Sequence, residues 1–461
     1  MKVFDDFLPW TKKRIEGISQ DQWQVLFNNA NGIIQDQQIP ITNIMVLLGA
    51  KLLGNQNLNL FKNRHALVQW YQSVGRYTFD IDGLQRLRSI TDDAIPAGKV
   101  NGVNLIGYSG ATTGLGEDVR NLAAMLESID IPYAINMLGH PADSVAYIKK
   151  QDRLVEHRYS HSIFCINLIE YQKIWQSTPD LHKVYGKIAL QAPWELPNLP
   201  KVSKECLDSV DTFWCISSFV LNAFESQEYT NSVLVPPICI ANTEITSFNQ
   251  LQSRPFTFLY VFDASSYLQR KNPLAAVNAF QTAFPTQTDV RLVLKVANVK
   301  DSSDYQALQR ACLSDKRIKL DSQMYSTDQL TQLMQRCDCY LSLHRSEGFG
   351  RTIAEACILG KPVIATNWSG SVDILGEQNV LSVSYRLVPV EEGQYPYSEG
   401  QAWAEAEIDD AADKMRQIVS LPEKQRAQIG DLNRIRVLER YTLTETKSQY
   451  RDLLAEFLVG Q

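Results

Sequence analysis

The chain has 461 residues, of which 44% are hydrophobic and 21% are charged, a composition typical of globular proteins and not of disordered or fibrous ones. Its 45 lysines and arginines against 51 aspartates and glutamates give a formal net charge of −6, so a nucleic-acid polymer is not expected as a partner. The eight cysteines form no Cys-x-x-Cys pair, and we expect buried, reduced thiols in a cytoplasmic protein.

Residues 1–95 have helical periodicity and little strand pattern, so we predict a helical N-terminal extension. Asp5 and Asp6 precede any apolar run, which does not fit a secretory signal. No stretch approaches the roughly 18 apolar residues of a membrane-spanning helix. Aromatic residues beside basic ones within 4–14 allow contact with a membrane surface, but docking on the next domain is the favoured reading.

An α/β pattern begins near residue 96 and extends to residue 245. A glycine-containing loop over 110–116 follows the first predicted strand, and a helix is predicted over 117–129, as in a β-loop-α-β unit. Continuous apolar runs indicate buried parallel strands. The strands are predicted over residues 100–108, 132–137, 162–169, 187–190 and 212–216.

A second α/β series covers residues 246–440, after a linker that ends near Pro255, and a C-terminal helix covers 441–461. Two doubly wound parallel sheets should therefore face each other, with a ligand cleft at the carboxyl ends of their strands. Helices are expected over 409–419 and 422–458. The strands of this half are predicted over residues 256–262, 291–296, 318–320, 339–343, 362–366 and 380–383.

The most informative segment follows the strand that ends at Leu343. A glycine-containing turn leads into a helix near Gly350, where free backbone N–H groups favour a phosphate. Glu347 precedes this helix, and Glu355 lies about 7 Å along its axis from the helix start, at about 1.5 Å per residue. Two carboxylates on either side of a phosphate site suit a nucleotide sugar, which has hydroxyls at both ends of a diphosphate.

This segment resembles the retaining glycosyltransferases of the GT-B fold, specifically family 4. The resemblance rests on Glu347-Gly348-Phe349-Gly350, on Glu355 eight positions after the first Glu, on Gly360-Lys361-Pro362-Val363-Ile364 and on Ser369-Gly370. It implies two Rossmann-like domains facing across a cleft. It also implies retaining, metal-independent transfer of a hexose from a UDP- or GDP-linked sugar to a hydroxyl of a glycan or lipid-linked acceptor.

The resemblance also implies roles for individual residues. Lys271 and Lys295 would stabilise the departing diphosphate, Glu347 would orient the sugar and Glu355 would hold the ribose. Many members carry an Arg about six positions before the loop Lys, where this chain has Ser265. The other donor-binding residues are expected to be Gly348, Phe349, Gly350, Arg351, Thr352, Arg270, Met324, Tyr325, Gly114 and Gly116.

Acceptor-side candidates are His140, Asp143, Trp194 and Glu195. The segments 192–197 and 403–405 resemble a bacterial subgroup associated with surface polysaccharides. That subgroup implies polysaccharide or glycoconjugate synthesis, with peripheral attachment to the inner face of the cell membrane if the acceptor is lipid-linked. A general base is not required, because the leaving phosphate can take the acceptor proton in front-face transfer.

Other readings remain open from the sequence. Lys271 and Lys295 could be ordinary solvated side chains. Met324 and Tyr325 could be packing residues, and Gly114 and Gly116 could only form a turn. His344 would contact the sugar or make a structural hydrogen bond. A sugar-nucleotide epimerase, a phosphorylase or a non-catalytic sugar-nucleotide-binding protein would share the cleft. Asp80-Ile81-Asp82 matches the motif of metal-dependent transferases, but it lies in the N-terminal extension.

Overall fold

The computed structural model describes residues 98–458 except for 139–158, 179, 203, 241–253, 300, 377 and 378. The predicted N-terminal extension, with its Asp80-Ile81-Asp82 motif, lies outside the described residues. The acceptor-side candidates His140 and Asp143 do too.

The N-terminal domain is built on a six-stranded parallel sheet with the order β2-β1-β3-β4-β5-β6. The predicted strands are present. A short edge strand, β6, was not predicted, because it has only three residues, one polar and two exposed. The strands are β1 (Gly98–Gly107), β2 (Tyr133–Met137), β3 (Tyr159–Cys165), β4 (Lys187–Gln191), β5 (Thr212–Cys215) and β6 (Ser232–Leu234).

Side-chain caps define where several helices of this domain begin. The side chains of Thr113, Asn167 and Ser217 each accept a backbone N–H from the first turn that follows. Helix α7 therefore begins at Gly114, three residues before the predicted start. The helices are α7 (Gly114–Ser128), α9 (Leu168–Ser177), α10 (Leu181–Tyr185), α11 (Lys204–Asp208) and α12 (Ser218–Glu225).

The C-terminal domain repeats this design with a six-stranded parallel sheet in the order β12-β11-β10-β7-β8-β9. All six strands were predicted within a few residues. They are β7 (Phe256–Asp263), β8 (Val290–Ala297), β9 (Ile318–Asp321), β10 (Cys339–Ser342), β11 (Val363–Thr366) and β12 (Ser382–Val383).

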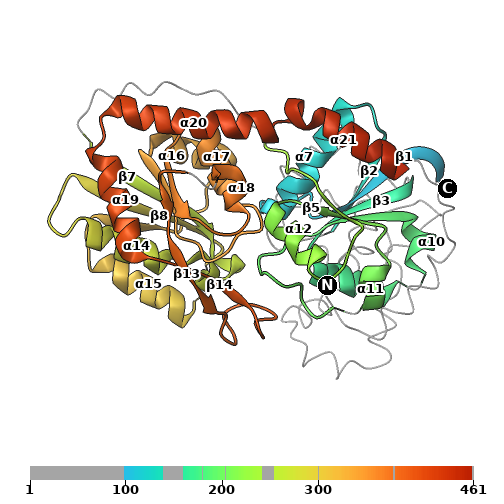
Figure 1. Cartoon of the computed structure of the whole chain (residues 1–461), viewed down its shortest axis with the longest axis horizontal. Coiled ribbons are helices and arrows are strands. Elements are labelled where there is room, and N and C mark those ends of the chain that lie inside the picture. Colours follow the sequence, from blue (N-terminus) through green and yellow to red (C-terminus); the bar gives the residue numbers. More distant parts are fainter. Residues whose placement is uncertain are drawn as a thin grey trace, which may run out of the picture.

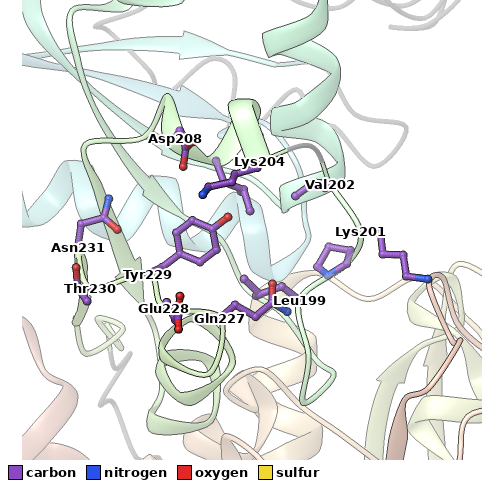
Figure 2. A pocket seen from close by; sticks show the side chains of 12 residues that line it. Leu199, Lys201, Val202, Lys204, Asp208, Gln227, Glu228, Tyr229, Thr230 and Asn231 are labelled. Atoms are coloured by element: carbon purple, nitrogen blue, oxygen red, sulfur yellow. The ribbon is translucent and has the colours of Figure 1, made fainter.

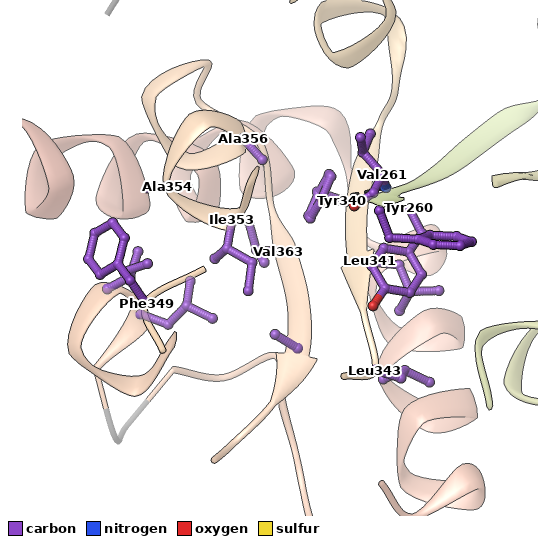
Figure 3. Close-up of a cluster of buried hydrophobic side chains, with 14 of the residues drawn as sticks. Tyr260, Val261, Tyr340, Leu341, Leu343, Phe349, Ile353, Ala354, Ala356 and Val363 are labelled. Atoms are coloured by element: carbon purple, nitrogen blue, oxygen red, sulfur yellow. Dashed lines mark hydrogen bonds between the residues drawn. The ribbon is translucent and has the colours of Figure 1, made fainter. Parts of the chain in front are cut away.

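Helices cover this second sheet, and α17 packs on it through apolar side chains. Ile353 and Ala354 of α17 are fully or almost fully buried, close to Val363 of β11 and Phe349 in the preceding turn (Figure 3). The helices are α13 (Leu268–Lys271), α14 (Pro273–Ala283), α15 (Ser303–Leu313), α16 (Thr327–Arg336), α17 (Arg351–Ile358), α18 (Ser371–Leu375) and α19 (Ile408–Ser420), with a 3-10 turn η5 (Ala264–Ser266) before α13.

An antiparallel hairpin of β13 (Tyr385–Pro389) and β14 (Ala402–Ala406) was not predicted. It projects from the C-terminal domain toward the N-terminal domain (Figure 1). Its strands are short and only partly apolar, so the sequence pattern did not distinguish them from a loop.

The last two helices connect the domains. Residues 422–458 were predicted as one helix, but the structure divides them into α20 (Glu423–Tyr441) and α21 (Leu443–Leu458). α20 runs along the C-terminal domain beside α17 and α18, and α21 continues over the N-terminal domain beside α7 (Figure 1). There, Tyr450 and Phe457 pack edge-on against Trp214 of β5, so the C-terminal segment completes the N-terminal core.

All eight cysteines are buried. Across the part of the chain that the structure describes, no helix combines the length and the apolar character needed to cross a bilayer.

Gly430 of α20 packs closely against the backbone at Gly360. A Cβ atom at this position of α20 would lie 1.9 Å from the carbonyl oxygen of Gly360. Gly430→Ala should therefore lower the free energy of unfolding by about 1–3 kcal/mol, although alanine is the better helix former. Urea unfolding measures the change. Gln428→Ala, at an exposed position of the same helix, should change it by less than about 0.5 kcal/mol, and equal effects of the two variants would contradict this packing.

Candidate active site

Glu347 lies after the carboxyl end of β10, between two cations from the loop that follows β7. The Lys271 ammonium donates a hydrogen bond to one carboxylate oxygen of Glu347, and Nη1 of Arg270 lies 3.1 Å from the other. Burial alone would raise the pKa of Glu347, but the charges of Lys271 and Arg270 outweigh it and hold that pKa well below its usual range. Glu347 is therefore ionised, and its charge is compensated.

The two cations differ in their access to the cleft. The Lys271 side chain is 15% exposed, and burial together with the charge of Arg270 lowers its pKa against the pull of Glu347. The Arg270 side chain is only 4% exposed and donates to the carbonyl oxygens of Ser266 and Ser346 at 3.2 and 2.7 Å. Arg270 is thus buried and binds the Glu347 carboxylate. A contact with the donor diphosphate was expected from the resemblance, but such a contact would need a solvent-accessible guanidinium.

The turn before α17 presents backbone groups rather than a capping side chain. Gly350, at the N-cap, has a φ of 101°, which favours glycine, and it provides no side-chain cap. The carbonyl oxygen of Gly348 accepts a hydrogen bond from Ser217 of the N-terminal domain at 2.6 Å. A Cβ atom at Gly348 would lie 3.1 Å from the carbonyl oxygen of Trp194. The turn that leads into α17 is therefore held against the N-terminal domain.

The glycine loop of the N-terminal domain meets this same helix. A Cβ atom at Gly114 would lie 3.5 Å from Cδ of Arg351, and Asp118 of α7 is ion-paired with the Arg351 guanidinium. Gly116 packs too closely on the carbonyl oxygen of Ala111 to carry a Cβ atom. The starts of α7 and α17, which are 237 residues apart in sequence (351 − 114), thus lie next to each other.

Glu355 follows Arg351 by one turn of α17. Burial raises the pKa of Glu355 to about 7; Arg351 partly opposes this and Glu117 of α7 adds to it. The carboxyl of Glu355 therefore titrates in the neutral range, unlike that of Glu347.

Lys295 is held by backbone oxygens beyond β9. Its ammonium donates to the carbonyl oxygens of Asp321 at 3.3 Å and of Gln323, and it lies 4.4 Å from the centre of the Tyr325 ring. Its side chain is 5% exposed. In this position Lys295 ties β8 to the turn that was expected to meet the base. Met324, in the same turn, is 72% exposed, so its side chain is open to a ligand.

The turn after β4 brings Trp194 and Glu195 to the C-terminal domain. Trp194 is buried and donates from Nε1 to the carbonyl oxygen of Asn198 at 2.7 Å. Glu195 accepts a hydrogen bond from the Tyr395 hydroxyl at 2.7 Å and lies 4.0 Å from Arg270. Glu195, predicted on the acceptor side together with Trp194, therefore lies beside the group formed by Arg270, Lys271 and Glu347.

His344 is fully buried between the hydroxyls of Ser342 and Ser371, each 3.0 Å from a ring nitrogen. Burial lowers its pKa to about 4. The geometry thus supports a structural hydrogen-bonding role for His344 rather than a contact with the sugar.

Sequence reasoning missed the contribution of the β13–β14 hairpin. Tyr395 from its connecting loop and Glu405 from β14 contact Glu195 and Arg345, respectively. The resemblance of segment 403–405 to a bacterial subgroup drew attention to this region, but it did not predict the contacts of Tyr395 and Glu405.

The described residues also surround a cavity of about 640 Å³ in the N-terminal domain (Figure 2). None of the predicted site residues lines it. Within the same described ranges, no three His, Cys, Asp or Glu side chains are grouped to hold a metal ion. The cavity is lined by Leu199, Pro200, Lys201, Val202, Lys204, Leu207, Asp208, Gln227, Glu228, Tyr229, Thr230 and Asn231.

Residues 243–434 match the family model described as glycosyl transferases group 1. No curated protein matches the chain in sequence. Among solved structures, Anabaena HepE in complex with UDP-glucose is similar with a TM-score of 0.52 and 15% identity, over 77% of this chain and 99% of that one. The E. coli trehalose-6-phosphate structure bound with UDP-2-fluoro glucose is similar with a TM-score of 0.54 and 10% identity, over 76% and 98%.

S. aureus TarM is similar with a TM-score of 0.47 and 13% identity over 67% of this chain, which spans only 58% of the TarM chain. The likeness to the HepE and E. coli structures, together with the two parallel sheets, confirms the predicted GT-B fold.

The hydrogen bonds of Lys295 predict that this lysine stabilises the turn after β9. Lys295→Met removes hydrogen bonds to buried carbonyl oxygens, so the free energy of unfolding should fall by about 1–3 kcal/mol. Thermal or urea unfolding provides the measurement. Lys319→Met is the control, because Lys319 also pairs with Asp321 but is 67% exposed. Unchanged stability of the Lys295 variant would show that this lysine does not hold the turn.

Proposed function

We propose that the chain, whose residues 243–434 match the family model described as glycosyl transferases group 1, is a retaining glycosyltransferase. It moves a hexose from a UDP- or GDP-linked sugar to a hydroxyl of a glycan or lipid-linked acceptor, in bacterial polysaccharide or glycoconjugate synthesis. The observation that carries this proposal is the ionised Glu347 beside Lys271 and the first turn of α17, facing the start of α7 across the domain boundary.

The donor diphosphate suits the space between these groups. Lys271 supplies a positive charge, and the backbone N–H groups at the start of α17 supply the positive end of a helix dipole. Both stabilise the negative charge that grows on the diphosphate as the glycosidic bond breaks. With this charge provided by the protein, the reaction needs no resident divalent metal.

Glu347 and Glu355 bind opposite ends of the donor, the hexose and the ribose. Glu347 stays ionised and orients the hexose, where its charge supports positive charge at the anomeric carbon. Glu355 accepts hydrogen bonds from the ribose. Arg270 and Glu405 do not touch the donor, and the acceptor enters from the side of Trp194 and Glu195.

A donor screen tests the proposed function directly. The full chain is incubated with UDP- and GDP-linked hexoses, with and without a chelator, and release of the nucleoside diphosphate is measured. HepE and the E. coli structure hold UDP-linked sugars, so the UDP series comes first. Turnover that survives chelation supports the proposal, and turnover that the chelator abolishes contradicts the metal-free mechanism.

Removal of the partly accessible cation, Lys271, should slow the reaction without preventing folding. We expect Lys271→Ala to lower kcat for transfer by about 10²- to 10³-fold, because the charge on the departing diphosphate loses its partner. Steady-state kinetics measures the loss, and a far-UV spectrum checks the fold. Lys319→Ala is the matched control at an exposed site of the same domain. A Lys271 variant with the wild-type rate would remove this residue from the mechanism.

The raised pKa of Glu355 predicts a pH dependence of donor affinity. Ribose hydroxyls donate to the carboxylate form, so the donor binds most tightly above the pKa of about 7. As the pH falls below this value, the dissociation constant should rise by up to about tenfold per pH unit. Calorimetry between about pH 5.5 and 8.5 measures the profile. In Glu355→Gln affinity should be weaker and independent of pH, and a profile unchanged from the wild type would argue against the ribose contact.

A further inference from the structure

Glu405 of β14 binds two loops of the candidate active site with its two carboxylate oxygens. Oε2 accepts a hydrogen bond from Nε of Arg345 at 2.6 Å and lies 2.5 Å from Nη2 of the same side chain. Oε1 accepts a hydrogen bond from Nδ2 of Asn272 at 3.0 Å. Asn272 follows Lys271 directly, and Arg345 precedes Glu347 by two residues. One carboxylate thus connects the segments that supply both members of the Lys271–Glu347 ion pair.

Arg345 strengthens this connection with its remaining donors. Its Nη1 donates to the carbonyl oxygen and to the side-chain oxygen of Gln269, at 2.8 and 2.9 Å. Its backbone N–H donates to the carbonyl oxygen of Arg270 at 2.8 Å, and its own carbonyl oxygen accepts from Ala404 at 3.0 Å. The Arg345 side chain is 16% exposed, so these bonds are largely shielded from water.

Asn272, which follows Lys271, transmits the hydrogen bond from Glu405 to the backbone that carries Lys271. It ends α13 and begins α14 with a φ of 50°, a left-handed conformation that asparagine tolerates better than most residues. Its side chain is buried, and the residue is 6% exposed. Because backbone rotation at Asn272 would redirect Lys271, the hydrogen bond to Glu405 restrains the direction of the lysine side chain.

We propose that Glu405 is a positioning residue for the transfer reaction. It fixes the loop that carries Lys271 against the loop that carries Glu347, without touching the donor itself. Displacement of a reacting group by about 1 Å can cost roughly 100-fold in rate, so a carboxylate outside the donor site controls the chemistry through this geometry. The inference rests on the proposed function, because it assigns Lys271 and Glu347 to the reaction.

Glu405→Gln tests this role with little change in side-chain size. The neutral amide loses the charge that strengthens the pair with Arg345. Its nitrogen also faces the donor group of Asn272, so that hydrogen bond forms again only if the Asn272 amide turns over. We expect kcat to fall roughly 10- to 100-fold and KM for the donor to change less than about threefold. Glu407→Gln is the control, because Glu407 pairs with Arg386 at 3.2 Å on the surface, and its kinetics should match the wild type.

A double-mutant cycle with Lys271→Ala separates positioning from general destabilisation. If Glu405 acts by placing Lys271, Glu405→Gln should cost much less in the Lys271→Ala background than in the wild type. Equal fold-losses in the two backgrounds would overturn the proposal, and so would an unchanged kcat in the single Glu405 variant.

Hydrogen exchange distinguishes failure of this inference from failure of the proposed function. Amides of residues 269–272 and 344–347 should exchange faster in Glu405→Gln than in the wild type or in Glu407→Gln. Unchanged protection would show that Glu405 does not hold the loops, whatever the activity. A wild-type chain that turns over no nucleotide sugar would refute the proposed reaction, and the exchange result would still decide whether Glu405 joins the two loops.

Discussion

A buried carboxylate must be compensated by nearby positive charge, and the candidate active site is organised around this requirement at Glu347. Arg270, which is almost inaccessible, and Lys271, which is partly accessible, provide that charge from one short segment. The segment and Glu347 both follow carboxyl ends of strands in the same parallel sheet, β7 and β10, which are hydrogen-bonded neighbours. Sheet topology therefore brings together residues that are 76 positions apart.

The arrangement also explains why two domains are needed. The start of α17 is anchored from the N-terminal domain through Ser217 and Asp118, and the β13–β14 hairpin makes a second crossing through Tyr395 and Glu195. Helix α21 packs on the N-terminal core, so the C-terminal segment of the chain adds a further connection between the two domains.

The parts that the sequence predicted depend on local patterns. Apolar runs and the glycines around Glu347 identified the strands and the start of α17, because short-range geometry determines them. The roles expected for Glu347 and Glu355 came from the resemblance to a family and stay predictions. Contacts over long separations could not be read in this way. The link from Glu195 to Tyr395 spans 200 residues, and that from Arg345 to Glu405 spans 60. Likewise, the strand pattern placed Lys295 at the end of β8 but did not reveal which carbonyl oxygens its ammonium would meet.

The central claim is that Lys271, Glu347 and the start of α17 form the donor site. A crystal structure of the chain with a UDP- or GDP-linked hexose measures this most directly. The account predicts that the diphosphate contacts Lys271 and the backbone N–H groups of residues 350–352, with the hexose at Glu347 and the ribose at Glu355. A nucleotide bound elsewhere, for example in the cavity beside Tyr229, with the Lys271–Glu347 pair unaltered and without contact, would contradict it.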